Sequence, residues 1–111
     1  MTEIREYLGL SGASAYGCWY ASLDRAAKVR IARSLIRLAE GNIGRVKSVG
    51  AGVMELKVHF GPGYRVYFGW DGPSLILLLG GGSKKRQNKD IADAQERWRD
   101  YQTRKRGNSC H

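Results

Sequence analysis

The sequence has few of the residues that build metal sites, disulfide frameworks or membrane spans. Its two cysteines, Cys18 and Cys110, lie neither in a C-x-x-C pair nor at a metal-ligand spacing from either histidine. We therefore expect no structural zinc, no disulfide framework and a cytoplasmic location. No apolar run approaches the roughly 20 residues that span a bilayer, and a signal-peptide pattern is missing, so no membrane association is expected.

Acidic residues are scarce as well. Ten Asp and Glu residues stand against 19 Lys and Arg residues, for a formal charge of +9 over 111 residues. No paired carboxylates and no cluster of metal ligands are evident, so hydrolysis by two carboxylates or by bound zinc is not supported, and we expect no metal and no cofactor. The excess of cations favours a polyanionic partner, either nucleic acid, a ribosome or an acidic protein.

The centre of the sequence is rich in strand patterns. Apolar and polar residues alternate along residues 54–60 and again along 64–70, which is the period of a half-buried strand. Residues 74–79 are almost wholly apolar, which predicts a strand buried on both faces. Glycine and proline mark a turn after each of the first two strands. The polar face of this sheet carries Lys57, His59, Arg65 and Tyr67, and there we expect the chemistry.

Helical patterns precede and follow these strands. A helix is predicted over residues 25–40, with Asp24 as its N-cap and Gly41 as its left-handed C-terminal residue. Its core-facing stripe is Ala27, Ile31, Leu35 and Leu38. A short helix at 18–23 and a closing helix at 89–105 are also expected.

These elements predict a single α+β domain. It is expected to cover residues 1–106, to begin with an edge strand within residues 2–10, and to be followed by a mobile tail at 107–111.

Two groups of cations stand out from the general excess. Arg30, Arg33 and Arg37 lie three and four apart on one side of the predicted helix, and we call them the arginine ridge. The ridge is either a solvated face or a docking surface for an acidic partner or ribosomal RNA. The second group, Lys84, Lys85 and Arg86, follows a glycine run at 80–82 that lacks the phosphate-loop pattern. We expect a flexible segment that brings these cations over the polar face of the sheet.

Three segments of the chain, taken in order, carry a family resemblance. They are RLAEGNIGRVKSVGAGVMELKV at 37–58, GPGYRVYF at 61–68 and LLLGGGSKKRQNKDIADA at 77–94. Together they resemble the RelE/ParE toxin superfamily, specifically the addiction-module killer proteins related to HigB. Lys84 matches the family's lysine after the glycine pair and Gln87 its following glutamine, whereas Arg45 stands where an acidic residue is common.

The resemblance implies a fold, a partner and an activity. The fold is a small RelE-like one, with N-terminal helices and a C-terminal helix packed on an antiparallel sheet of about four strands. The partner is a cognate antitoxin, expected to be a helix-turn-helix protein, that silences the toxin in a hetero-oligomeric complex. Many members cleave mRNA in the ribosomal A site without a metal, whereas ParE-type members inhibit DNA gyrase and cleave nothing.

Metal-free RNA cleavage needs a base, a group that stabilises the phosphorane, and an acid. Arg65 suits the second role because its planar fork binds two phosphate oxygens, the alternative being a surface ion pair with Glu55. Lys57 and His59 are candidates for the base and the acid, and Lys84 for a catalytic phosphate contact. The candidate RNA-binding residues are Lys85, Arg86, Lys47 and Tyr67; for Tyr67, packing in the core is the alternative to stacking on a base.

We therefore predict a toxin that is a ribosome-dependent mRNA endonuclease. Cationic groups hold phosphate well and move protons poorly, so slow turnover on free RNA is expected, with the ribosome supplying alignment. Two alternatives remain open at this point: a gyrase inhibitor of the ParE kind, and a non-toxic basic module that binds nucleic acid.

Overall fold

The computed structural model describes residues 2–109, which contain five strands and three α-helices. The strands are β1 (Glu3–Glu6), β2 (Val46–Ser48), β3 (Met54–Val58), β4 (Tyr64–Asp71) and β5 (Leu75–Ser83). The helices are α1 (Ala15–Ala21), α2 (Arg25–Ala39) and α3 (Gln87–Ser109), and a 3-10 turn, η1 (Lys84–Arg86), precedes α3. The predicted α+β class is confirmed.

A single open sheet joins all five strands in the order β1-β5-β4-β3-β2. The pairs from β2 to β5 are antiparallel, as expected. The prediction of an antiparallel sheet of about four strands is nevertheless wrong, because β1 adds a fifth strand that runs parallel to β5. A parallel neighbour requires the chain to cross back to the same end of the sheet, and the long segment between β1 and β5 allows this return.

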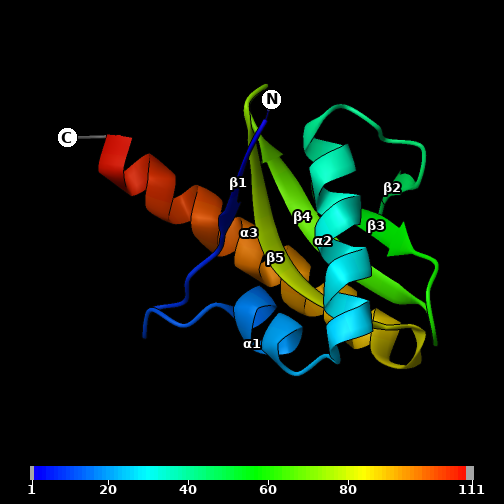
Figure 1. The fold of residues 1–111 in the computed structure, drawn as a ribbon. Coiled ribbons are helices and arrows are strands. Elements are labelled where there is room, and N and C mark those ends of the chain that lie inside the picture. The colour runs from blue at the N-terminus through cyan, green and yellow to red at the C-terminus, as the bar shows by residue number, and fades with distance from the viewer. Residues whose placement is uncertain (1, 110–111) are drawn as a thin grey trace.

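Helices cover both faces of the sheet. Figure 1 shows α2 in front of the strands and α3 crossing behind them. On the first face, Tyr16 of α1 and Ile31 of α2 share a buried cluster with Phe68 and other strand residues. On the opposite face, Trp98 of α3 packs in a second cluster with Tyr67. The face expected to be polar and open is therefore covered by α3 over its middle.

Local signals set the bounds of α2 as predicted. The carboxylate of Asp24 accepts a hydrogen bond from the backbone N–H of Ala27 at 2.8 Å, which satisfies a free donor of the first turn. Gly41 follows the last turn with a φ of 99°, a conformation that glycine adopts without strain. The predicted core stripe of this helix, Ala27, Ile31, Leu35 and Leu38, is buried throughout.

The glycine run is a paired strand, so the expected flexible segment is wrong. Residues 80–83 form the end of β5 and pair with Tyr64 to Tyr67 of β4. Glycine is needed here because other groups pack directly on the backbone: a Cβ on Gly81 would overlap the indole of Trp19, and one on Gly82 would overlap the carboxylate of Asp90. Lys84 therefore follows the end of a fixed strand.

Two other helices differ from their predicted bounds. Helix α1 covers residues 15–21 rather than 18–23, because the hydroxyl of Ser14 accepts from the backbone N–H of Gly17 and caps the first turn. Helix α3 begins at Gln87 and continues to Ser109, so residues 107–109 of the expected mobile tail are helical. Residues 110–111, including Cys110, lie outside the described part of the chain, while Cys18 is free and exposed.

Within residues 2–109, none of the helices combines the length and the apolar character needed to cross a membrane.

The close contact between Gly81 and Trp19 generates a stability prediction. We expect Gly81→Ala to lower the free energy of unfolding by about 1–3 kcal/mol, because the new methyl group forces the indole or the strand to move. Urea denaturation followed by fluorescence measures this difference. Gly44→Ala is the control, since its Cβ meets only ordinary contacts, and its effect is expected to stay within about 0.5 kcal/mol. Equal stability of the Gly81 variant and the control would contradict the packing described.

Candidate functional site

A small pocket lies at the turn between β3 and β4, next to the start of η1. Its volume is about 120 Å³, and we call it the hairpin pocket. Four cationic or titratable side chains line it together with residues of the turn: Lys57, His59, Arg65 and Lys84. These are the four side chains predicted as catalytic, so the structure brings the whole predicted set together.

Strand pairing explains how these side chains meet. Lys57 of β3 and Arg65 of β4 are direct partners across the two strands. Tyr64 pairs with Ser83 of β5, so Lys84, the next residue, begins η1 beside the same end of β4. Two like charges directly opposite each other in a sheet are unfavourable. Such an arrangement persists where function requires it, and here it points to the binding of an anion.

A fully buried carboxylate, that of Glu55, lies behind Arg65. One oxygen, Oε1, is 3.6 Å from Nε of Arg65 and 3.7 Å from Nζ of Lys47, and the other, Oε2, accepts a hydrogen bond of 2.9 Å from the amide of Gln87. The ion pair considered from the sequence therefore exists, but it is buried, with Arg65 only 8% exposed. Nε of Arg65 thus faces Glu55, and the same side chain lines the hairpin pocket.

The prediction that Tyr67 binds RNA is wrong. Its side chain is fully buried under α3, so it cannot stack on a base, and the packing alternative is the correct one. Burial, reinforced by the charge of Glu55, raises the pKa of the Tyr67 phenol far above its ordinary value, so the phenol stays neutral. Lys47 pairs with Glu55, and Lys85 and Arg86 are exposed on η1, next to the pocket but outside its lining.

The arginine ridge lies next to the hairpin pocket, across the residues Lys57, Val58 and His59. Its three arginines line a second hollow of about 160 Å³, which we call the arginine hollow. The charged and titratable residues around it are Arg30, Arg33, Arg37, Arg45, Lys57 and His59. Lys57 and His59 thus line both hollows, so the ridge, expected as a separate docking surface, adjoins the candidate catalytic residues.

Sequence reasoning missed the site roles of Glu55 and Arg45. Glu55 is the one acidic residue of β3 and lies diagonally across from Arg65, which was the available signal. Arg45 comes immediately before β2, and only its position opposite α2 reveals that it joins the ridge.

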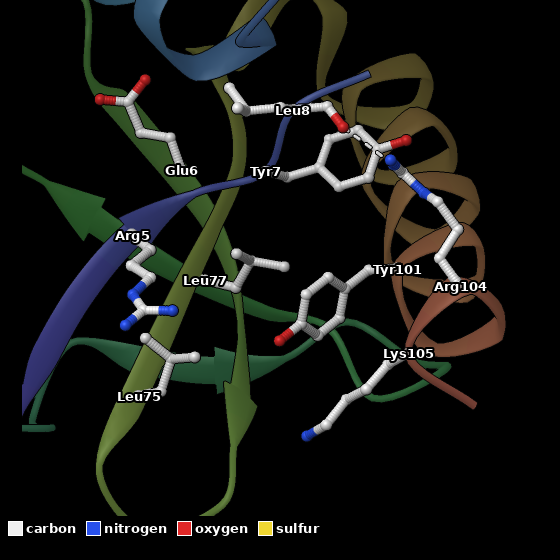
Figure 2. A pocket seen from close by; sticks show the side chains of 9 residues that line it. All are labelled: Arg5, Glu6, Tyr7, Leu8, Leu75, Leu77, Tyr101, Arg104 and Lys105. Atoms are coloured by element: carbon white, nitrogen blue, oxygen red, sulfur yellow. Dashed lines mark hydrogen bonds between the residues drawn. The ribbon is translucent and has the colours of Figure 1, made fainter. Parts of the chain in front are cut away.

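A larger hollow of about 430 Å³ lies elsewhere, between β1, β5 and α3. In Figure 2, Leu75 and Leu77 lie on the strand side and Tyr101 and Arg104 come from α3. Its cations are already paired: Arg5 with Glu3, Arg104 with Asp100, and Lys105 with Asp71. It is therefore a weaker candidate for binding an anion than the two hollows beside β3.

No cluster of three or more His, Cys, Asp or Glu side chains that could hold a metal ion occurs in the described part of the chain.

Comparison with known proteins identifies one family relationship. No protein-family model matches the chain. A protein of Haemophilus influenzae, described as an uncharacterized protein, is 41% identical over 81 residues, which are 72% of this chain and 82% of that protein. The chain belongs to the same family as this protein. The relationship covers most of both chains, and the description of the relative assigns no activity to either.

The buried ion pair generates a prediction that a double-mutant cycle can test. Arg65→Ala leaves the buried carboxylate of Glu55 with less compensation, so we expect it to lower the free energy of unfolding by about 3 kcal/mol. Adding Glu55→Gln removes the buried charge and is expected to recover much of this loss. Chemical denaturation of the two single variants and the double variant measures the coupling. Strictly additive effects would show that the two side chains do not interact.

Proposed function

We propose that this protein is the toxin of a type II toxin–antitoxin system, a member of the RelE/ParE superfamily that cleaves mRNA on the ribosome. The observation that carries the proposal is the shared lining of the hairpin pocket by Lys57, His59, Arg65 and Lys84. A single anionic group bound there contacts side chains able to hold a phosphate and to move protons.

The proposed reaction is an internal transesterification of RNA. The 2′-oxygen loses its proton and attacks the adjacent phosphorus, and the bond from phosphorus to the 5′-oxygen breaks, with a proton delivered to that leaving oxygen. The products are a 2′,3′-cyclic phosphate and a 5′-hydroxyl end, so atoms and charge balance without a co-reactant. The extra negative charge of the phosphorane is the point at which a cationic site accelerates the step.

Each side chain of the pocket has a role in this scheme. Arg65, held from behind by Glu55, presents its terminal nitrogens to two phosphate oxygens. Lys84, exposed at the start of η1, adds a second positive charge to the phosphate. His59 is assigned to proton transfer because imidazole exchanges protons near neutral pH, and Lys57, opposite Arg65, is assigned to the remaining proton transfer.

The size of the pocket supports ribosome dependence. A volume of about 120 Å³ lies well below the roughly 300–1,000 Å³ of sites that enclose a whole small molecule. The pocket therefore grips a phosphate group rather than a nucleotide, and alignment of the 2′-oxygen has to come from elsewhere. An mRNA held in the ribosomal A site supplies that alignment, which is worth several kcal/mol, on the order of 7 to 11 in favourable cases.

The proposal includes a RelE-like fold, a cytoplasmic location and a cognate helix-turn-helix antitoxin as partner. The order of two helices followed by antiparallel strands β2 to β5 and a closing helix is compatible with that fold. The same three quoted segments that resemble the superfamily contain β2, β3, most of β4 and β5, and about the first third of α3.

The test is cleavage of a defined mRNA by the purified protein, with and without programmed ribosomes. We expect cleavage with ribosomes and little without. Arg65→Lys and Lys84→Ala are each expected to slow it by roughly 100-fold, because each removes a contact made to the transition-state phosphate. Arg65→Lys is preferred to Arg65→Ala because it keeps a cation beside Glu55 and preserves folding.

Arg99→Ala is the matched control, since Arg99 is exposed on α3, outside both hollows. Its cleavage rate is expected to equal that of the wild type. Growth arrest with intact mRNA and a DNA damage response would replace the proposal by gyrase inhibition. Normal growth on expression of the folded protein would leave only a non-toxic binding module.

A further inference from the structure

The arginine hollow concentrates positive charge that nothing in its lining balances. Arg30, Arg33 and Arg37 come from successive turns of α2, and Arg45 and Lys57 close the hollow from the loop before β2 and from β3. No acidic side chain lines it. Gathering these cations without a counter-charge is unfavourable for the folded protein alone and becomes favourable when an anion binds.

Several cations on other surfaces of the protein have carboxylate partners. Within residues 2–109, Arg5, Lys89, Arg104 and Lys105 each form an ion pair with an acidic residue. Glu55 forms ion pairs with both Lys47 and Arg65. None of the ion pairs in this part of the chain involves the arginines of the hollow or Lys57. Of the cations that line the two adjoining hollows, therefore, only Arg65 has a carboxylate partner.

Two contacts hold the hollow in shape before any ligand binds. The guanidinium of Arg30 lies over the ring of Phe60 at 4.9 Å from its centre, which limits the freedom of that side chain. The backbone N–H of Lys57 donates to the carbonyl of Arg45 at 3.1 Å, which fixes the loop that carries Arg45 against β3. A site whose groups are already positioned loses less conformational entropy on binding.

The chemistry of the lining favours phosphate over a protein partner. Val58 is its one apolar residue, whereas the core of a protein interface is rich in apolar and aromatic side chains. Arginine guanidinium groups match phosphate oxygens in pairs. Lys57, Val58 and His59 line both hollows, so a nucleic acid backbone that enters one hollow reaches the other within a few nucleotides.

We propose that the arginine hollow is a second phosphate-binding subsite that holds the RNA backbone next to the phosphodiester in the hairpin pocket. The inference rests on the proposed function, since it takes RNA as the occupant of the hairpin pocket. The subsite makes binding depend on RNA length: a short RNA fills the hairpin pocket alone, and a longer one engages both hollows.

The experiment measures binding without cleavage. The probes are oligouridylates of two and nine nucleotides with 2′-O-methyl riboses, which lack the attacking hydroxyl. The dinucleotide carries a single phosphodiester, and both are titrated into the protein by calorimetry at several salt concentrations. We expect Arg33→Ala and Arg37→Ala each to weaken binding of the longer RNA about tenfold at low salt, as the loss of a charge-assisted contact does. The slope of log K against log salt is expected to fall in magnitude by about 0.7 per arginine.

The shorter RNA and a control variant sharpen the result. Binding of the dinucleotide is expected to be unchanged by either substitution, and Arg99→Ala is expected to change the binding of neither probe. Equal losses on both lengths, no loss on either, or no RNA binding by the wild type would overturn the subsite. Intact RNA binding together with lost binding of the cognate antitoxin would assign the hollow to that protein instead.

Because the probes cannot be cleaved, the binding experiment tests the proposed subsite independently of the proposed endonuclease activity. If the wild-type protein binds the two RNAs with the expected length dependence but cleaves no mRNA, the subsite is supported and the endonuclease activity is contradicted. If the wild-type protein cleaves mRNA but the arginine variants bind RNA normally, the endonuclease activity is supported and the subsite is contradicted.

Discussion

The arrangement of the candidate site depends on one buried carboxylate. Glu55 has no exposed surface, and its two oxygens face Arg65, Lys47 and Gln87, which come from β4, β2 and the start of α3. A buried negative charge is stable only when cations or hydrogen-bond donors lie beside it, so the contacts with Glu55 hold these three elements together. The consequence is a guanidinium whose Nε faces a carboxylate and whose side chain lines the same pocket as Lys57 and Lys84.

Around this point the protein separates compensated from uncompensated charge. The groove between β1, β5 and α3 has an apolar floor and cations that already have carboxylate partners. Among the cations that line the two hollows beside β3, only Arg65 has a carboxylate partner. Net positive charge spread over the whole surface would only promote weak contact with any polyanion, whereas charge left unpaired at one edge of the sheet directs that attraction to one place.

Much of this arrangement follows from local patterns in the sequence. The alternation along β3 and β4 puts Lys57 and Arg65 on one face whatever the rest of the fold, and the stripe of α2 sends its arginines away from the core. The direction of β1 was beyond such reasoning, because a four-residue strand carries no information on whether its distant partner runs parallel. For Tyr67 the sequence left packing and base stacking open, since burial of this side chain depends on where α3 crosses the sheet.

The glycine run shows a different limit of sequence reasoning. Glycine disfavours strands on average, so a run of it predicts flexibility, yet Gly81 and Gly82 are required by the close packing of Trp19 and Asp90. Lys84 owes its fixed position to that packing. The contact of the arginine ridge with Lys57 and His59 likewise depends on how α2 lies over the sheet edge, which no spacing along the chain encodes.

The central claim is that the hairpin pocket grips the RNA phosphodiester that is cut. A crystal structure of the protein with an uncleavable 2′-O-methyl RNA tests it most directly. The account predicts phosphate oxygens at about 3 Å from the terminal nitrogens of Arg65 and from Nζ of Lys84. RNA bound instead in the groove between β1 and α3, or touching η1 alone through Lys85 and Arg86, would contradict it.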